Sequence, residues 1–284
     1  MEINPQDVKA FLSERPIGRD DAFGKTFLGH IPANNSYGLA EMDVAIRVSH
    51  PRQGDLKENL QMQYKNELQL CSLRQRNIIS FIGFSETSEN FYLVYEMVQA
   101  RPLAEHIEGL TWEQALKVLK GIASGLAFLH SHPEGPFVHS NICIGNILVT
   151  KDFMPKLVDF RYCVVEGKQT SYDNPRYYPS KKEGVANVKE DIFAFGLVAL
   201  QLITKDSRTV YAVEEGHDIS LHHILDLYVP LFKEKGNLLH TSYGQKKESR
   251  KITEMIFNCL KKDSELDLKT FHRDLVLLSL AKQC

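Results

Sequence analysis

The sequence lacks a long apolar run, a charge excess and any paired-cysteine motif. Its longest strongly apolar stretch, Phe195 to Ile203, is far shorter than the ~20 residues that a membrane-spanning helix needs. The 34 basic and 36 acidic residues nearly cancel, giving a net charge of −2, which argues against a general nucleic-acid-binding surface. The five cysteines include no CxxC pair, so we expect reduced thiols and a cytoplasmic protein.

The amino terminus has neither the basic nor the apolar segment of a signal peptide, and Glu2 stands where N-myristoylation needs glycine. We expect a near-complete soluble protein. Hydrophobic residues make up 43% and charged residues 25% of the chain, an ordinary globular balance. At ~100–200 residues per domain, 284 residues predict one large domain or two lobes.

The first half of the chain alternates short β-rich runs with one helix. Compact apolar runs at 44–46 and 91–95 predict buried strands. Apolar side chains at every fourth position from Leu56 to Leu68 predict a helix of about four turns between them. The segment Met97 to Pro102 looks like a linker to the second half.

The second half is predicted to be mainly helical. Thr111-Trp112-Glu113-Gln114 fits a capping box before a helix over 115–129. The runs 147–149 and 156–158 predict a hairpin, and 191–203 predicts a buried helix. A last amphipathic helix is marked by Leu268, Phe271, Leu275 and Leu278. Together the two halves predict a two-lobed α+β chain.

Short motifs along the chain follow a definite order. Val44-Ala45-Ile46-Arg47 lies on a predicted strand, and Glu67 lies on the helix after it. His139-Ser140-Asn141-Ile142-Cys143-Ile144-Gly145-Asn146 precedes the hairpin, Asp159-Phe160-Arg161 ends it, and Asp191 to Gly196 begins the buried helix. In this order they resemble the eukaryotic protein kinase motifs V-A-I-K, the helix-αC Glu, H-R-D-x-x-x-x-N, D-F-G and D-x-x-x-x-G. Phrases such as Gly125-Leu126-Ala127-Phe128-Leu129-His130 look most like the plant receptor-like kinase group.

The resemblance covers residues 15 to 280 and implies a bilobal protein kinase-like fold. It divides the chain into an N-terminal extension (1–14), a β-rich N-lobe with helix αC (15–96), a hinge (97–102) and a mostly helical C-lobe (103–284). Residues 205–250 match the family poorly, and we assign them no role.

Departures from the family pattern fall on the catalytic positions. Asn141 stands where the family has its catalytic Asp, and a neutral amide cannot accept a proton near pH 7. General-base participation is worth about 10²–10⁴ in rate, so this change alone could reduce transfer to a trace. Cys143 replaces the catalytic-loop Lys that neutralises the γ-phosphate, and a mostly neutral thiol does not supply that charge.

The nucleotide-binding motifs are degenerate. Arg47 replaces the β3 Lys, which keeps an ion pair with Glu67 open but changes the fit to phosphate. Gly18 and Gly24 match glycines of the Gly-rich loop, whereas acidic residues at 20–21 replace the middle glycine. We expect this loop to fold as a hairpin and to bind phosphate poorly. Where the N-lobe meets the hinge, the resemblance assigns Glu96 and Met97 to the nucleotide site.

Both metal-ligand positions, Asn146 and Asp159, are retained. They predict either Mg²⁺ ligands or residues that hold the loop by hydrogen bonds to its backbone. In the switch segment Phe160–Arg161, arginine replaces the family's glycine and is confined to ordinary backbone regions. We hypothesise one fixed conformation, with Arg161 reaching toward the phosphate position.

The resemblance assigns structural roles to His139, Asp191 and Gly196, which anchor the catalytic loop on the central helix. Ser140 replaces the Arg of H-R-D, and the sequence 178–180 replaces A-P-E. Asp267 stands where the family has the Arg that pairs with the A-P-E glutamate, so both partners of that buried pair are absent. The activation segment offers these hydroxyl groups to another kinase: Thr170, Ser171, Tyr172, Tyr177 and Tyr178.

Retained fold-holding residues beside altered catalytic residues predict a catalytically impaired pseudokinase. We expect a signalling scaffold or an allosteric partner of an active receptor-like kinase or receptor. It would be cytoplasmic and recruited to the plasma membrane only through that partner, with no nucleic-acid partner. Two alternatives remain open: a weakly active Ser/Thr protein kinase, and an ATP-sensing switch without turnover. ATP with Mg²⁺ is the one cofactor pair that the motifs leave open.

Overall fold

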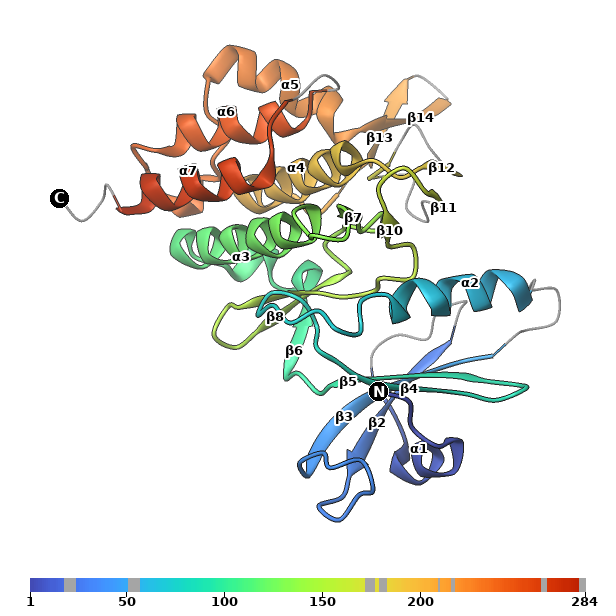
Figure 1. Ribbon diagram of the computed structural model, residues 1–284. Helices are drawn as coiled ribbons and strands as arrows, with labels where there is room; N and C mark the ends of the chain where they lie inside the picture. The colour runs from blue at the N-terminus through green and yellow to red at the C-terminus, as the bar shows by residue number, and fades with distance from the viewer. Residues whose placement is uncertain are drawn as a thin grey trace. The chain divides into compact units, whose positions relative to one another are not determined.

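The computed structural model describes residues 1–17, 24–50, 57–171, 177–178, 183–208, 210–215, 218–261 and 265–280 (Figure 1). The chain divides into two compact units, Met1–Gln99 and Ala100–Cys284. The first unit is built on a β-sheet and the second mainly on helices, as the α+β expectation requires.

The first unit holds a five-stranded antiparallel sheet in the order β1-β2-β3-β5-β4. Its strands are β1 (Leu12–Pro16), β2 (Lys25–Ile31), β3 (Met42–Ser49), β4 (Phe81–Glu86) and β5 (Phe91–Glu96). The sheet is accompanied by the helices α1 (Pro5–Phe11) and α2 (Lys57–Leu68). The strands predicted at 44–46 and 91–95 are therefore confirmed.

The amino-terminal residues belong to the core of the first unit. Ile3, Val8 and Phe11 are buried together with side chains of the sheet. Glu2 forms a parallel bridge with Phe84, and the Ile3 amide donates to the Phe84 carbonyl over 2.8 Å. The first residues of the chain thus extend the edge of the sheet at β4 and exclude water from its face.

Helix α2 carries the apolar stripe that its sequence predicts. Leu60 and Tyr64 are buried against Phe81, Phe91 and Leu93, all from β4 and β5. Leu56, the first residue of the predicted stripe, lies outside the described residues. Burial of this stripe places α2 firmly on the sheet of its own unit.

The Gly-rich segment lies in the sequence between β1 and β2, which pair in antiparallel fashion. The Ile17 amide donates to the Thr26 carbonyl over 2.8 Å, so the two strands approach each other at the open end of the loop. Gly24 is described, whereas Gly18 and the acidic pair at 20–21 lie outside the described residues.

In the described part of the second unit, five helices form its body (Figure 1). They are α3 (Trp112–His130), α4 (Val188–Thr204), α5 (Ile224–Lys235), α6 (Ser249–Cys259) and α7 (Leu268–Leu280). Helix α4 packs against α3 and α6, and α3 packs against α7. Nearly all of α4 from Asp191 onward is buried, which confirms the prediction of a buried helix there.

Short strands and 3-10 turns complete the second unit. The strands are β6 (Ala100–Pro102), β7 (Phe137–Val138), β8 (Ile147–Thr150), β9 (Pro155–Leu157), β10 (Val164–Val165), β11 (Gln169–Ser171), β12 (Glu183–Val185), β13 (Val210–Glu215) and β14 (Asp218–His223). The 3-10 turns are η1 (Leu103–Glu105), η2 (Ile107–Gly109) and η3 (Thr241–Tyr243). The predicted hairpin is confirmed as β8–β9, and β6 adds a third strand beside β8.

The capping box at the start of α3 is confirmed. The Thr111 hydroxyl accepts from the Gln114 amide over 3.3 Å, and the Gln114 side chain accepts from the Thr111 amide over 2.9 Å. Trp112, the only tryptophan of the chain, is buried next to this cap and donates its Nε1 hydrogen to Glu248 over 2.9 Å. Its fluorescence therefore reports on the second unit.

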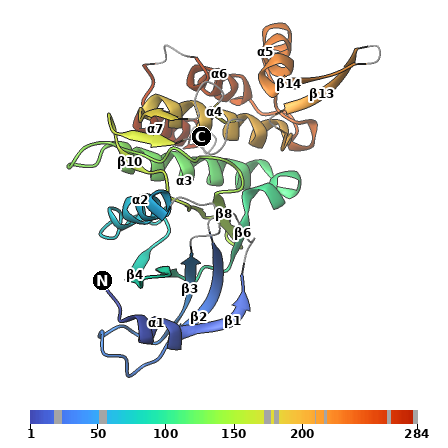
Figure 2. The same cartoon turned by 90° about the vertical axis from the view of Figure 1, so that its right-hand side faces the viewer.

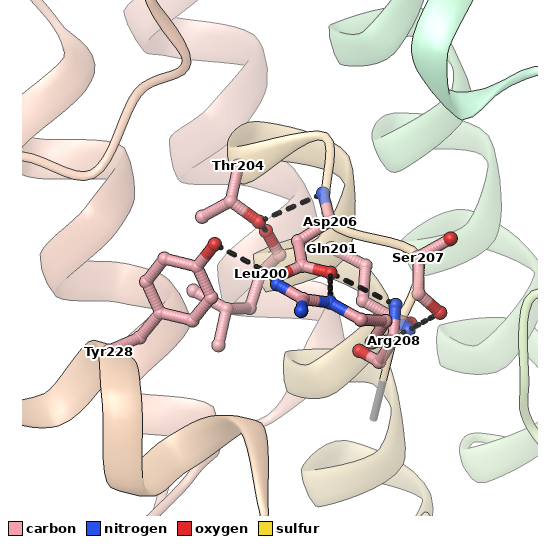
Figure 3. A network of polar contacts seen from close by, with 7 residues as sticks. All are labelled: Leu200, Gln201, Thr204, Asp206, Ser207, Arg208 and Tyr228. Atoms are coloured by element: carbon pink, nitrogen blue, oxygen red, sulfur yellow. Dashed lines mark hydrogen bonds and ion pairs between the residues drawn. The ribbon is translucent and has the colours of Figure 1, made fainter. Parts of the chain in front are cut away.

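The turn after α4 is held by a polar network (Figure 3). Asp206 accepts two hydrogen bonds from the Arg208 guanidinium, over 2.8 and 2.7 Å, and one from the Tyr228 hydroxyl of α5 over 3.1 Å. Gln201 of α4 donates to the carbonyl groups of Ser207 and Arg208. This network ties α4 to α5 at the base of the β13–β14 ribbon, which lies beside α5 (Figure 2).

Candidate functional site

The loop His139 to Asn146 joins β7 to β8 in the second unit. Two side-chain bonds organise it. Asn141 donates through its side-chain Nδ2 to Asp159 Oδ2 over 2.9 Å, and Asn146 donates through its side-chain Nδ2 to the backbone carbonyl of Asn141 over 3.0 Å. The predicted catalytic and metal positions Asn141, Asn146 and Asp159 are thus brought together. Cys143, in the same loop, is buried.

Asp191 anchors this loop to the first turn of α4. Its carboxylate is fully buried and accepts from the amides of His139 and Ser140 over 2.6 and 2.9 Å. It also bonds His130 Nε2 at 3.0 Å and accepts from the Tyr178 hydroxyl at 3.3 Å. Burial by itself raises the pKa of Asp191, but the hydrogen bonds and charge of His130 outweigh it, so the net pKa is lowered.

Gly196 lets α4 approach α6 closely. A Cβ atom at this position would lie 2.8 Å from the Cys259 Cβ and 2.9 Å from a Leu260 methyl group. Any larger side chain would therefore push the two helices apart. In this structure Gly196 acts through packing of α4 against α6, and its predicted part in anchoring the catalytic loop stays a prediction.

Two non-glycine residues of the site have left-handed backbone geometry. Ser140 has φ 61° and Asp159 has φ 67°, a backbone region that residues other than Gly, Asn and Asp rarely occupy. The bond from the Ser140 amide to Asp191 and the bonds on the Asp159 carboxylate hold them there. Arg161, which replaces the family's glycine, does not have a positive φ.

Arg161 turns back onto Asp159. Its Nε lies 2.5 Å from Asp159 Oδ1, and its side chain is only 5% exposed. The structure thus pairs Arg161 with the nearest carboxylate, and the expectation that it reaches toward a phosphate position stays a prediction. Phe160 is also buried and packs on the His139 ring at 4.5 Å between centroids.

In the first unit, β3 and α2 bring Arg47 and Glu67 together. Arg47 Nη1 lies 3.8 Å from Glu67 Oε1, and the two side chains are 12% and 5% exposed. The Tyr95 hydroxyl donates to the other oxygen of Glu67. Arginine at this position therefore keeps the family's strand-to-helix ion pair.

The other predicted nucleotide-site residues of the first unit lie at strand ends. The Glu96 carboxylate accepts from the Ser80 amide over 2.8 Å at the end of β5, and Met97 follows directly. Gly24 has φ 149°, and a Cβ there would lie 2.3 Å from the Val48 carbonyl oxygen. Glycine at 24 is thus required for the approach of β2 to β3, whatever the loop binds.

Sequence reasoning missed the part that Tyr178 plays. This side chain is fully buried, and its hydroxyl accepts from the Ile142 amide over 2.8 Å while it donates to Asp191. The neighbouring Tyr177 is buried and donates to Gln201 over 2.8 Å. Two adjacent aromatic residues in an otherwise polar segment were the available signal for burial.

The expectation that the activation segment offers its hydroxyl groups to another kinase is wrong for Thr170, Tyr177 and Tyr178. All three side chains are buried, and the Thr170 hydroxyl donates to the Tyr162 carbonyl over 2.7 Å. Ser171 is partly buried, and Tyr172 lies outside the described residues.

Asp267 caps α7. Its carboxylate accepts from the Thr270 amide and hydroxyl, each over 2.8 Å. Aspartate at this position therefore has a local role that needs no arginine partner.

The stability of the second unit is expected to fall on mild acidification. Burial lowers the pKa of the fully buried His139 imidazole, so the folded state stays neutral where the unfolded chain takes up a proton. Because the unfolded state then binds more protons, the free energy of unfolding decreases from about pH 7 to about pH 5, by up to ~1.4 kcal/mol per pH unit. Urea unfolding followed by Trp112 fluorescence measures this decrease.

Asp191 titrates in a lower range. Its pKa is lowered, so its contribution is present at neutral pH and is lost only when the pH falls through that lowered value. His240→Asn, a change at an exposed histidine, is the control and should keep the wild-type slope. Equal stability at about pH 7 and about pH 5 would contradict the assignment to His139.

Comparison with known proteins places this geometry in a family. The model of the protein kinase domain matches residues 39–269, most of the chain. This chain belongs to the protein kinase domain family, with a β-sheet N-lobe and a helical C-lobe, and the predicted fold class is confirmed.

The chain is similar to plant receptor-like kinases. It is 28% identical over 254 residues to wall-associated receptor kinase 5 of Arabidopsis thaliana, covering 82% of this chain and 33% of the relative. It is 23% identical over 264 residues to cysteine-rich receptor-like protein kinase 27 of the same plant, covering 86% of this chain and 39% of the relative. The matched part is thus well under half of these relatives. Among the described residues, no helix is long and apolar enough to cross a membrane.

Proposed function

We propose that this chain is a catalytically impaired kinase domain that acts by binding another signalling protein. One observation carries the proposal: the group at the catalytic-base position is the Asn141 amide, which donates its hydrogen to Asp159. A general base must take a proton from the substrate hydroxyl, and an amide has no pKa in the range that permits it. Phosphoryl transfer therefore loses the group that orients and deprotonates its nucleophile.

Two sets of contacts that hold the kinase fold are present. Asp191 carries the catalytic loop on α4, and Arg47 pairs with Glu67 in the first unit. A chain that keeps its architecture while its catalytic positions change retains surfaces for binding. Its similarity to receptor-like kinases supports a partner of that class, an active receptor-like kinase or a receptor, for which it is a scaffold or an allosteric partner.

We place the protein in the cytoplasm, with recruitment to the plasma membrane through that partner. This location rests on the proposed partner and on the five cysteines, which include no CxxC pair and favour reduced thiols. Nucleic acid is not among the proposed partners, since the chain has a net charge of −2.

A phosphoryl-transfer assay tests the loss of catalysis. We expect incubation with labelled ATP, Mg²⁺ and a generic protein substrate to give no more incorporation than an Asp159→Ala variant gives. The reason is the missing base, worth about 10²–10⁴ in rate, together with the missing catalytic-loop lysine at Cys143.

An active receptor-like kinase domain assayed in parallel shows that the substrate and conditions permit transfer. Incorporation that exceeds the Asp159→Ala level would support a weakly active Ser/Thr kinase and overturn the proposal. Equal incorporation by wild type and the Asp159→Ala variant, while the active kinase domain does phosphorylate the substrate, upholds the proposal.

A further inference from the structure

Both oxygens of the Asp159 carboxylate face hydrogen-bond donors of this chain. Oδ1 accepts from Arg161 Nε over 2.5 Å, and Oδ2 accepts from the Asn141 amide over 2.9 Å. The Asp159 and Arg161 side chains are 15% and 5% exposed, so water screens the pair weakly. The carboxylate that the kinase family uses for metal is thus already paired within its own unit.

Magnesium requires a different environment. It binds oxygen ligands in a near-ideal octahedron, keeps several waters and depends on carboxylate charge. The guanidinium of Arg161 stays protonated, so its charge cancels that of Asp159 and repels a second cation at the same oxygens. At the other ligand position, the Asn146 side chain donates through Nδ2 to the Asn141 carbonyl, and its remaining ligand atom is a neutral Oδ1 that adds no charge to offset Arg161. Among the described residues, no three His, Cys, Asp or Glu side chains gather as an alternative metal site.

We infer that Arg161 is a built-in replacement for the divalent cation at Asp159, which closes the family's metal site in this chain. The inference deepens the proposed function and rests on it, because a closed metal site has a use only where phosphoryl transfer has been given up. Any nucleotide that the protein binds would then be bound without help from a metal held by Asp159.

The position of Arg161 in the sequence explains how the replacement arises. It lies two residues after Asp159, where the family has a glycine, and Asp159 itself adopts the left-handed backbone. The segment turns back on itself there, and the long guanidinium side chain reaches Asp159 Oδ1. A glycine at 161 would leave that oxygen without its charged partner.

Removing the internal cation should reopen the site. In an Arg161→Ala variant, the partly buried Asp159 carboxylate loses the charge of the guanidinium, so we expect a lower melting temperature that Mn²⁺ or Mg²⁺ restores by binding the folded state. We also expect Mn²⁺ binding, followed by electron paramagnetic resonance with and without ATP, to strengthen by more than about 10-fold relative to wild type. Wild type should show neither a metal-dependent melting temperature nor Asp159-dependent Mn²⁺ binding.

Three further variants make the test specific. Arg273→Ala removes an arginine that is 66% exposed on α7 and should leave the metal response of wild type unchanged. Arg161→Lys keeps the positive charge and should remain insensitive to metal. Arg161→Ala combined with Asp159→Asn removes both charges, and metal should not stabilise it.

The outcomes separate this inference from the proposed function. If wild type binds Mn²⁺ and Asp159→Asn abolishes the binding, the closed metal site is refuted, whereas the proposed function falls only to phosphoryl transfer. If Arg161→Ala folds only when Mn²⁺ is present, the inference is supported. If Arg161→Ala fails to fold even with metal, the wild-type titration against Asp159→Asn decides by the same criterion.

Discussion

Replacement of Asp191 by alanine is expected to lower the free energy of unfolding of the second unit by about 3–5 kcal/mol. The fully buried carboxylate satisfies the amides of His139 and Ser140, and both would lose their acceptor in a place that water does not reach. A single buried donor left unpaired costs about 1–3 kcal/mol. Because domains of this kind are stable by about 5–15 kcal/mol, the loss is a large part of the total.

Urea unfolding of the Asp191→Ala variant, followed by Trp112 fluorescence, measures the effect in the unit that contains the change. Asp191→Asn keeps one carbonyl oxygen as an acceptor and should be destabilised less. Asp152→Ala, at an exposed aspartate of the same unit, should change stability by no more than about 0.5 kcal/mol. A variant Asp191→Ala as stable as Asp152→Ala would show that the loop does not depend on this anchor.

Replacement of Tyr178 by alanine is expected to be nearly as severe, at about 3–5 kcal/mol. The side chain is large and fully buried, so the change leaves a cavity, and it removes the hydroxyl that accepts from the Ile142 amide. Tyr178→Phe removes the hydroxyl alone and should cost about 1–3 kcal/mol, because the Ile142 amide would be left unpaired. The same urea experiment measures both variants.

Hydrogen exchange at the Ile142 amide adds a local measurement. In Tyr178→Phe this amide should exchange faster than in wild type by a larger factor than amides in the middle of α3. The control is Tyr228→Phe, which removes a half-buried hydroxyl that donates to Asp206 in the same unit and should cost about 0.5–1.5 kcal/mol without changing Ile142. Unchanged exchange at Ile142 in Tyr178→Phe would contradict the proposed bond.

Together these contacts explain why the altered catalytic loop keeps a defined shape. Asp191 holds its first residues from α4, and Tyr178 holds Ile142 from the activation segment. Neither contact depends on a group that phosphoryl transfer needs. The loop is therefore held by the fold, independently of whether Asn141 or an aspartate occupies the base position.

Local patterns in the sequence predicted much of the fold. The capping box of Thr111 and Gln114 involves residues three apart, and the β8–β9 hairpin joins strands that are neighbours along the chain. The burial of α4 followed from a segment that is apolar nearly all round. In each case the residues that decide the structure lie within a few positions of one another, so their spacing carries the information.

Contacts between distant segments were beyond such patterns. Ile3 packs under a sheet whose edge strand begins at Phe81, and Trp112 donates to Glu248, which lies 136 residues further along the chain. The tyrosines at 177 and 178 could be read as accessible hydroxyl groups until the fold buried them. Nothing in the order of residues along one segment states which other segment will cover it.

By itself, the sequence determined the kinase family, the α+β class and the loss of an ionisable group at Asn141, because these depend on which residues stand in a fixed order. Only the tertiary structure decided that Arg161 pairs with Asp159 and that Tyr178 bonds the catalytic loop. A long side chain can reach several possible partners. The partner that it binds depends on which groups the fold buries next to it and on whether water can still solvate it there.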